Sequence, residues 1–384
     1  RERKTGRKLR QAVTNLFCQE DIIMKKKVLA VLLGGCMVVG MLAGCGSKAD
    51  DTKKADGDTK TEGSGDSKGY HFEVVVKSFQ SSYWQDELGV TANTTGPNAE
   101  SDIADQVNML NNAINKNPDG IALAACDQNS VLDSLQSALD KKIPVVCFDS
   151  GVPDAPEGSV YATVVTDNEQ AGGIAAEHIY EAIKDRIGNG QVRVGEVNQD
   201  ATSANISERG MGFINKFIEL AKADGKTVAV VGNDFYVNQV KDNGDQASAD
   251  VVLEVAVPAQ TTVELCATEA SNIMNKDDTI AMFGSNQVSA EGVLTANQNL
   301  NKLGTDDDKI VAAGFDAGSV IKAAVKDGTL LGAVTQSPLM QGKISIETLA
   351  KICDGESVED VTTDGYWYDS TNMDDEDISP NLYD

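Results

Sequence analysis

Two apolar segments of the sequence end in the same way, with an acidic residue followed two positions later by glycine. Residues 143–148 precede Asp149, and residues 310–315 precede Asp316. Such apolar runs predict parallel strands buried on both faces, and open α/β sheets bind ligands beyond the carboxyl ends of these strands. A carboxylate there can accept several hydrogen bonds. Asp149 and Asp316 are therefore candidate ligand residues; the alternative is that each only caps the following helix.

Polar side chains also follow other apolar runs. Asp127 comes soon after residues 121–125, Asn286 after residues 280–283, and Gln336 after another short run. Each position can be explained by turn chemistry alone. Their shared position beyond predicted strands favours a common ligand site.

Arg209 is expected close to the start of a helix. The helix dipole disfavours a cation there. This favours a role in holding a ligand oxygen, and an ordinary surface position is the alternative.

A loop after the first predicted strand, residues 70–76, concentrates polar and aromatic side chains. It contains Gln80, Ser81, Tyr83 and Trp84. Only 5% of the chain is aromatic, and Trp84 is one of two tryptophans. Aromatic faces suit the C–H faces of a sugar or the face of a base; ordinary core packing is the alternative.

The connection after Trp84 is unusually short. The next predicted strand covers residues 90–95, whereas parallel strands need a connection of about a dozen residues or more, usually a helix. Most of the first helix is therefore expected to be missing, which would expose one flank of the sheet.

Predicted strands and helices alternate along the rest of the chain. In residues 101–115, for example, apolar residues recur at helical spacing. Such alternation implies right-handed βαβ units and parallel sheets, so the fold class is predicted as α/β with two lobes. The predicted N-terminal lobe comprises residues 70–163 and 337–364, and the predicted C-terminal lobe comprises residues 164–336 and 365–384.

Composition argues against several classes of function. The 384 residues carry a formal net charge of −26, which argues against nucleic acid as a partner. Only two His are present, and the seven Cys lack metal-binding spacing, so no metal site or cofactor is predicted.

Cys126 and Cys147 come at the ends of predicted strands and are expected either as buried thiols or as a disulfide. The acidic residues 374–377 are expected to be solvated.

The N-terminal region has the pattern of a targeting segment. Residues 24–44 begin with Met and three Lys, continue as an apolar run and end in Leu-Ala-Gly before Cys45. This predicts a lipoprotein signal peptide and a chain anchored by lipid at Cys45 on the extracytoplasmic face of the cell membrane; a short transmembrane anchor is the alternative. Residues 1–23 are expected to be an upstream artefact, and residues 45–69 a disordered tether.

Several short motifs occur together in one known family. They are residues 80–84, Phe148-Asp149, Glu208-Arg209-Gly210 with Gly212-Phe213, Ser285-Asn286, Gly314-Phe315-Asp316 and Ala333-Val334-Thr335-Gln336. With them, the chain resembles the type I periplasmic sugar-binding proteins, the ribose-binding group of ABC-importer components, over about residues 71–369. The resemblance implies two Rossmann-like lobes with parallel sheets, joined by a three-strand hinge.

The same resemblance implies a set of ligand residues. Charged and amide side chains would hydrogen-bond sugar hydroxyls, and aromatic side chains would pack against the ring. The full predicted set is Gln80, Ser81, Tyr83, Trp84, Asp127, Asp149, Ser150, Arg209, Asn286, Phe315, Asp316 and Gln336. Ala124 and Ser150 stand where ribose binders carry Asn and Arg, which argues against ribose itself.

The predicted function is capture of a monosaccharide between the lobes and its delivery to an ABC transporter permease. Carboxylates accept, Arg donates and amides do both, which suits a polyol. The protein is expected to be a monomer and not an enzyme. Alternatives are a nucleoside or furanosyl signal molecule as ligand, and a sugar-responsive regulator of the same fold, which the lipoprotein signal argues against. A hydrolase would use Asp149 and Asp316 as its carboxylate pair.

Overall fold

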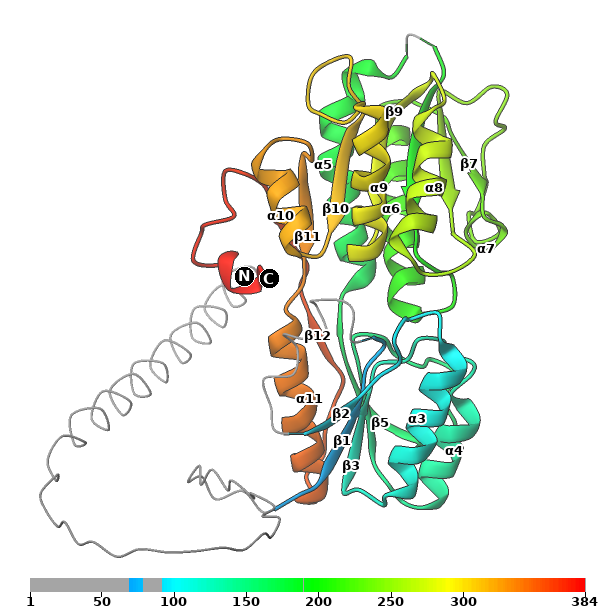
Figure 1. Cartoon of the computed structure of the whole chain (residues 1–384). Coiled ribbons are helices and arrows are strands. Elements are labelled where there is room, and N and C mark those ends of the chain that lie inside the picture. The colour runs from blue at the N-terminus through cyan, green and yellow to red at the C-terminus, as the bar shows by residue number, and fades with distance from the viewer. Residues whose placement is uncertain (1–68, 79–91, 189, 384) are drawn as a thin grey trace, which may run out of the picture. The chain divides into compact units, whose positions relative to one another are not determined.

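The computed structural model describes residues 69–78, 92–188 and 190–383. The predictions that lie outside these residues concern the upstream segment 1–23, the signal peptide, the lipid site Cys45, the tether up to residue 68, the loop with Gln80, Ser81, Tyr83 and Trp84, and the short connection after it. The described part contains two β-sheets, each covered by helices (Figure 1).

The first described sheet has six strands, all parallel, in the order β12-β5-β4-β3-β1-β2. Its strands are β1 (Phe72–Val75), β2 (Asn93–Thr95), β3 (Gly120–Leu123), β4 (Val145–Phe148), β5 (Val160–Thr166) and β12 (Val361–Thr363). The helices α3 (Ile103–Asn115), α4 (Leu132–Asp140) and α11 (Pro338–Cys353) cover it. We call this sheet and its helices the first lobe.

The central strands of the first lobe are buried on both faces, as their apolar runs predicted. Val75 and Ile121 pack in one cluster with residues of α3 and α4. The neighbouring residues Val74 and Ala122 belong to another cluster, which contains Leu349 of α11. Successive side chains of a strand point to opposite faces, so an uninterrupted apolar run is what a strand between two helix layers requires.

The second described sheet has seven strands in the order β13-β11-β10-β9-β6-β8-β7. Its strands are β6 (Val192–Val197), β7 (Val228–Gly232), β8 (Val251–Ala256), β9 (Thr279–Gly284), β10 (Val311–Phe315), β11 (Gly332–Thr335) and β13 (Tyr366–Tyr368), of which only β13 is antiparallel. The helices are α5 (Asn168–Ile183), α6 (Ala204–Ala223), α7 (Asp234–Val237), α8 (Val263–Met274), α9 (Gln287–Leu300) and α10 (Ser319–Lys326), with short 3-10 turns at Lys184–Arg186 and Ser379–Asn381. We call this sheet with α5 to α10 the second lobe.

The described chain crosses between the two sheets three times. It passes from β5 to α5, from β11 to α11, and from β12 to β13. At the crossings, the Thr166 hydroxyl donates to Gln336 Oε1 at 2.9 Å, and Gln341 Nε2 donates to the same hydroxyl at 2.7 Å. Side-chain hydrogen bonds therefore tie two of the three connections together.

Most predicted elements of the first lobe are found within a few residues of their expected positions. The helix predicted at residues 101–115 is α3, although only Leu110 and Ile114 of its apolar stripe are fully buried. Cys126 and Cys147 are both free and buried, so they are not bridged. Burial raises the pKa of the Cys147 thiol to about 12, as expected for an unreactive buried cysteine.

The helices α5 and α6 of the second lobe cross with their backbones in contact. A Cβ on Gly172 would lie 2.0 Å from the Arg209 carbonyl oxygen, and one on Gly212 would lie 2.2 Å from the Glu169 carbonyl oxygen. Only glycine permits this approach, because the obstructing atoms are backbone. The crossing also fixes where α6 presents Arg209.

Replacing Gly212 with Ala is expected to destabilise the protein by about 3 kcal/mol, since one of two packed helices must move away. Gly173→Ala is the matched control, because its new Cβ would only make an ordinary 3.6 Å contact with Lys216 and Ala favours a helix. Urea unfolding followed by circular dichroism compares the two variants. Equal midpoints would contradict the close crossing.

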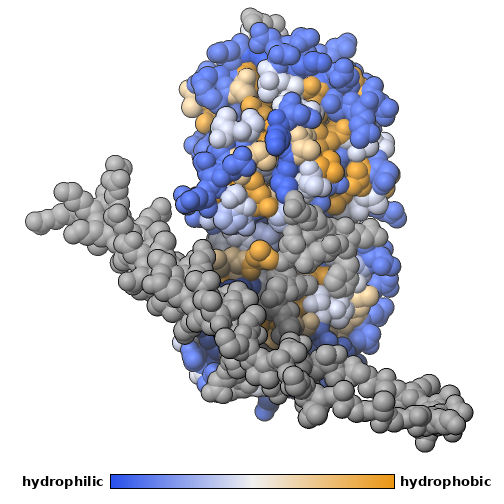
Figure 2. Space-filling model, turned by 60° about the vertical axis from the view of Figure 1, so that its left-hand side comes forward, coloured by the Kyte–Doolittle hydropathy of each residue, from blue (hydrophilic) through white to orange (hydrophobic). Residues whose placement is uncertain are grey.

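The described residues contain neither a membrane-spanning helix nor a candidate metal site. No described helix is long and apolar enough to cross a membrane. The described residues also contain no cluster of His, Cys, Asp and Glu suited to a metal ion. Figure 2 shows hydrophilic residues over much of the described surface on one face, with hydrophobic residues scattered between them.

Candidate functional site

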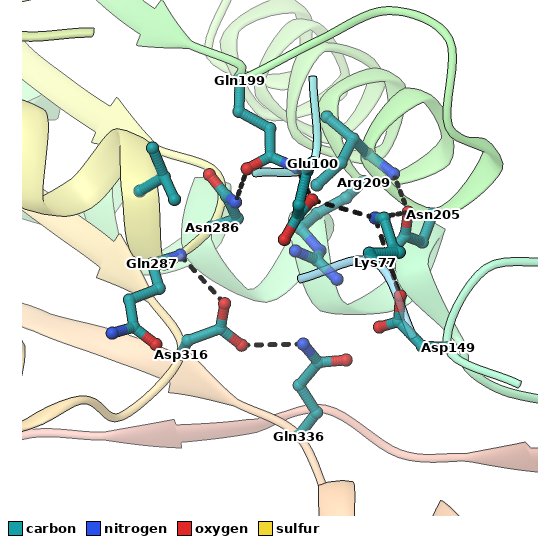
Figure 3. A pocket seen from close by; sticks show the side chains of 12 residues that line it. Lys77, Glu100, Asp149, Gln199, Asn205, Arg209, Asn286, Gln287, Asp316 and Gln336 are labelled. Carbon is teal, nitrogen blue, oxygen red and sulfur yellow. Dashed lines mark hydrogen bonds and ion pairs between the residues drawn. The ribbon is translucent and has the colours of Figure 1, made fainter. Parts of the chain in front are cut away.

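A small polar cavity lies where strands of both sheets end (Figure 3). Most of its polar lining follows the carboxyl ends of β1, β4, β6, β9, β10 and β11 or starts the next helix. The lining residues are Lys77, Glu100, Asp149, Gln199, Asn205, Ile206, Arg209, Asn286, Gln287, Val288, Asp316 and Gln336. The cavity volume is about 20 Å³, which is room for about one water molecule.

Asp149 and Lys77 form an ionic pair in the first lobe that also reaches the second. Lys77 Nζ lies 3.7 Å from Asp149 Oδ2 and 3.4 Å from Glu100 Oε2. Asn205 of α6 donates to Asp149 Oδ2 at 2.8 Å and accepts from Lys77 Nζ at 3.4 Å. Burial opposes the charge of Lys77, but Glu100 and then Asp149 outweigh it and hold its pKa above the usual value. Lys77 is therefore a buried cation at the centre of the site.

Asp316 is held from several sides in the second lobe. Gln336 Nε2 donates to its Oδ1 at 2.7 Å, and the backbone N–H of Gln287, the first residue of α9, donates to its Oδ2 at 2.9 Å. Burial raises the pKa of Asp316, while Arg209 and these donors counteract the shift. Asp316 therefore accepts from the first N–H of α9, whose N-cap residue is Asn286, and does not cap the helix that follows it in sequence.

Arg209 is fully buried and its guanidinium is fixed in one orientation. Nη1 donates to the Ser285 carbonyl at 2.8 Å, and Nη2 donates to Asn168 Oδ1 at 2.8 Å. The guanidinium carbon lies 3.6 Å from the centre of the Phe315 ring. Stacking and forked hydrogen bonds suit the planar guanidinium. The surface alternative for Arg209 is thus wrong.

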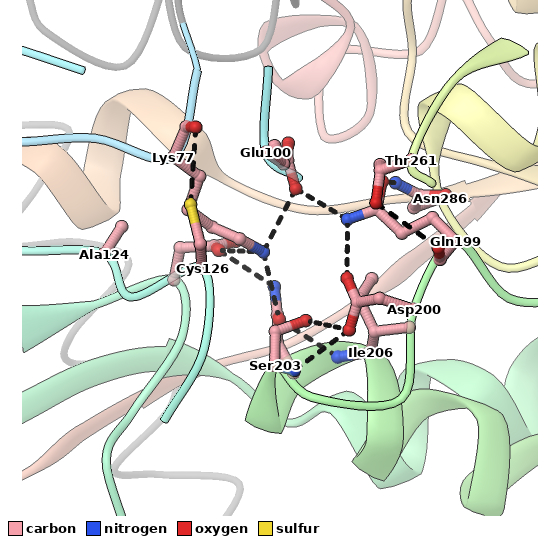
Figure 4. Close-up of polar contacts among 12 residues, drawn as sticks. Lys77, Glu100, Ala124, Cys126, Gln199, Asp200, Ser203, Ile206, Thr261 and Asn286 are labelled. Atoms are coloured by element: carbon pink, nitrogen blue, oxygen red, sulfur yellow. Dashed lines mark hydrogen bonds and ion pairs between the residues drawn. The ribbon is translucent and has the colours of Figure 1, made fainter. Parts of the chain in front are cut away.

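The rim of the cavity is closed by polar contacts of Gln199, one of which joins the two lobes (Figure 4). Gln199, beyond β6, donates to Glu100 Oε2 at 2.6 Å. Gln199 Oε1 also accepts from Asn286, and its carbonyl accepts from the Thr261 hydroxyl at 3.3 Å. Glu100 belongs to the first lobe, so this contact is one that must break when the lobes separate.

Asp149 and Asp316 share an uncommon backbone conformation. Their φ angles are +56° and +73°, in the left-handed region that side chains other than Gly, Asn and Asp rarely adopt. Such backbone strain is often found at functional sites, where the surroundings hold it in place. Here both residues with this conformation have their side chains at the cavity wall.

The predicted site residues divide into three groups. Asp149, Arg209, Asn286, Asp316 and Gln336 line the cavity. Phe315, Ser150 and Asp127 are buried but are not among its lining residues. Gln80, Ser81, Tyr83 and Trp84 lie outside the described residues.

Two of the three residues off the cavity wall have other side-chain contacts. Phe315 lies against Arg209, so it supports the guanidinium. The side chain of Asp127 accepts from the backbone N–H groups of Asn129 and Ser130 at 2.9 and 2.7 Å, which is turn chemistry before α4. Ser150 is fully buried beside Asp149.

Five polar lining residues were not predicted from the sequence. Lys77 closes the first strand and carried a usable signal, because it is a charged residue at the end of an apolar run. Gln199 lies in a polar loop after β6 and had the same kind of signal. Gln287 follows Asn286 in the polar stretch beyond β9 and had this signal too. Glu100 and Asn205 had none.

A second and larger cavity adjoins the first. It has a volume of about 270 Å³ and shares Glu100, Gln287 and Val288 with the smaller one. Ser78 of the first lobe and residues 261–264 of the second also line it. The polar site therefore continues outward along the cleft.

Two lobes whose parallel strands end at one shared polar cavity define an α/β binding protein. Residues 72–357 match the family model described as periplasmic binding protein domain, and the chain belongs to this family. The predicted fold class and the predicted resemblance to type I sugar-binding proteins of ABC importers are confirmed.

Known proteins of this kind cover most of the chain. The D-allose-binding periplasmic protein of Escherichia coli (strain K12) is 22% identical over 293 residues, which is 72% of this chain and 83% of that protein. An ABC transporter solute-binding protein from Agrobacterium vitis, solved with bound D-fucose, has a TM-score of 0.66 at 26% identity and covers 82% of this chain and 100% of its own. A Brachyspira murdochii protein described as "ABC transporter, LacI family transcriptional regulator" has a TM-score of 0.67 at 31% identity, with 82% and 99% covered.

Proposed function

We propose that the protein captures a neutral monosaccharide between its lobes and delivers it to the permease of an ABC transporter. The observation that supports this best is the convergence of Asp149 and Asp316, from different sheets, on one cavity lined by amide and cationic side chains. A polyol presents many hydroxyls, each a donor and an acceptor. Carboxylates, amides and fixed cations together can satisfy such a ligand.

The charges at the cavity favour a neutral ligand over an anionic one. Its cations are Lys77 and Arg209, against the carboxylates Glu100, Asp149 and Asp316. Lys77 already faces two carboxylates, and Arg209 donates to two protein oxygens. A sugar acid or sugar phosphate would bring further negative charge to a site that already holds three carboxylates against two cations, which costs binding energy.

Ligand entry requires the lobes to part. The cavity of about 20 Å³ is far smaller than the several hundred Å³ of typical ligand pockets. The contacts from Asn205 to Asp149 and from Gln199 to Glu100 close it. A hinge motion at the three crossings would open it, and sugar hydroxyls would then replace these contacts one for one.

The remaining parts of the proposal follow from the sequence and the family. The protein acts outside the cytoplasm, held to the cell membrane by lipid at Cys45, as a monomer. It binds its sugar without turnover and without a cofactor. A permease recognises the sugar-bound, closed form.

A thermal unfolding screen tests the proposal. D-Allose, D-fucose, D-arabinose and D-ribose form the neutral panel, adenosine represents nucleosides, and D-galacturonate is the anionic control. A neutral sugar at 100 times its dissociation constant should stabilise the native state by about 2.7 kcal/mol, which raises the melting temperature by about 5 °C. A shift with adenosine or D-galacturonate alone would contradict the proposed substrate class.

A further inference from the structure

Strand β7 forms one edge of the second sheet (Figure 1). In the part of the chain that the structure describes, it pairs with β8 alone. The Thr227 carbonyl and the Asn233 N–H, which flank β7, both bond to β8, at 3.0 and 2.9 Å. Backbone groups alternate in direction along a strand. Val228, Val230 and Gly232 therefore direct their N–H and C=O groups outward, beyond the edge of the sheet.

The sequence of this edge strand favours pairing with a further strand. Residues 227–232 read Thr-Val-Ala-Val-Val-Gly, without a charged residue or a proline. Short segments of high β propensity and low charge pair readily with other chains when they lie at an open edge. Such an edge needs protection if the chain is to stay apart from its copies.

The side chain of Asn243 occupies this edge. Its Nδ2 donates to the Val230 carbonyl at 2.8 Å, and its Oδ1 accepts from the Val230 N–H at 2.8 Å. One amide side chain thus makes the two bonds that a neighbouring strand would make at this residue. Gly244 lies against another outward group, because a Cβ on it would stand 2.3 Å from the Val228 carbonyl oxygen.

The segment that carries Asn243 is polar and does not continue the sheet. Residues 241–248 are exposed and include two Asp and one Lys. Asp242 has a φ of +54°, which strand residues do not adopt. Gln191 Nε2 fastens the segment by donating to the Gln246 carbonyl at 2.7 Å. The segment therefore holds Asn243 against β7 and presents solvated charges where another strand would approach.

We propose that Asn243 caps the free edge of the second sheet and prevents two copies of this chain from pairing through β7. The excluded occupant is the β7 strand of a second copy, which would pair antiparallel about a two-fold axis centred on Val230. The proposal is independent of the proposed function, because neither β7 nor residues 238–250 line the sugar cavity.

Asn243→Ala is expected to strengthen self-association of the full-length protein by about 100-fold, because two capping hydrogen bonds in each copy no longer compete with the dimer. Sedimentation velocity over a series of protein concentrations measures the dimer dissociation constant. Gly244→Ala should shift association in the same direction. Its new Cβ would push the segment away from Val228 and leave the Asn243 amide itself unchanged.

Asn297→Ala is the matched control. Its Oδ1 accepts from the backbone N–H groups of Lys302 and Leu303, at 2.8 and 2.9 Å, so this variant also loses two hydrogen bonds to backbone. It should lose stability and stay as monomeric as the unaltered protein. The edge cap is refuted if Asn243→Ala associates no more strongly than Asn297→Ala.

Hydrogen exchange of the Val230 N–H tests the contact itself. In the unaltered protein this group should exchange slowly, although it points away from β8. In dilute, monomeric Asn243→Ala it should exchange about tenfold faster, and it should become protected again as the dimer forms. An unchanged exchange rate in the dilute variant overturns the proposal. Failure of every neutral sugar to bind would reject the proposed function and leave these results unaffected.

Discussion

Isothermal titration of the Asp316→Asn variant is expected to show sugar affinity lowered by about 100-fold. Both carboxylate oxygens already accept a hydrogen bond, one from Gln336 Nε2 and one from the Gln287 backbone N–H. An asparagine offers one acceptor oxygen, so its NH₂ group would face one of these donors. The side chain must turn or be pushed out of place, and its acceptor for a sugar hydroxyl is lost.

Asp149→Asn is expected to lose affinity to a similar extent, for a different reason. Its Oδ2 accepts from Asn205 and faces the Lys77 ammonium. Removing the charge leaves Lys77, which is only 2% exposed, with Glu100 as its nearest remaining anion. A buried cation with less compensation is costly, so this variant should also unfold at lower urea concentration.

Asp250→Asn is the control for both variants. Asp250 Oδ2 accepts from the backbone N–H and from the hydroxyl of Thr227, each at 2.8 Å. The Asp250→Asn variant therefore also loses a carboxylate that accepts two hydrogen bonds. Asp250 is not among the residues lining the cavity, so the sugar affinity of the Asp250→Asn variant should be unchanged. If Asp149→Asn and Asp316→Asn both bind as tightly as Asp250→Asn, the cavity is not the sugar site.

The same carboxylates give the pH dependence a definite sign. In the proposed complex, ionised Asp316 would accept a stronger, charge-assisted hydrogen bond from a sugar hydroxyl than the protonated acid would. Burial raises the pKa of Asp316 above the usual value. Affinity should therefore fall as the pH drops through that raised pKa. The loss should begin at a higher pH than the ordinary Asp value would produce.

The sequence predicted site residues best where the apolar pattern of a single strand determines their position. Residues 143–148 and 310–315 are uninterrupted apolar runs because helices cover both faces of each sheet. The residue after each run therefore lies at the sheet edge, and Asp149 and Asp316 could be located there without knowledge of the lobe contacts.

Residues that line the cavity through contacts between the lobes could not be predicted. Asn205 has an ordinary position in the first turn of α6, and only the meeting of the lobes brings it to Lys77 and Asp149. Glu100 lies in a first-lobe loop before α3, and its contact with Lys77 depends on how that loop folds. Asp127 shows that a strand-end residue can also serve a turn. Its position after a strand was correct as a pattern, but its side chain is used by the turn before α4. A polar residue directly after a strand indicates the edge of a sheet, but this pattern does not determine which way its side chain points.

Arg209 was predicted as a ligand residue from its place near a helix start, and the structure supplies a different physical reason. Ten of the twenty residues of α6 are buried, and Arg209 lies on that buried side between Phe315, Asn168 and the Ser285 carbonyl. The helix dipole is a small effect beside these contacts. The burial of Arg209 could not be predicted from the residues at the start of α6 alone.

Arg209→Lys should nearly abolish sugar binding, with an affinity loss of about 100-fold or more and a stability loss of about 3 kcal/mol. A lysine cannot donate to Ser285 and Asn168 at once while stacking on Phe315. Its compact ammonium would move away from Asp316, whose charge Arg209 now stabilises. Titration calorimetry and urea unfolding measure the two losses.

Arg193→Lys is the control that separates the loss of a ligand contact from the loss of a buried arginine. Arg193 is 8% exposed, and its guanidinium pairs with Asp278 and Glu254 at 3.0 and 2.6 Å. It lies near the amino end of β6, at the opposite end from the cavity. Arg193→Lys should cost stability without changing affinity. Equal affinities for Arg193→Lys and Arg209→Lys would mean that Arg209 supports only the fold, because a ligand contact cannot be lost without a change in binding.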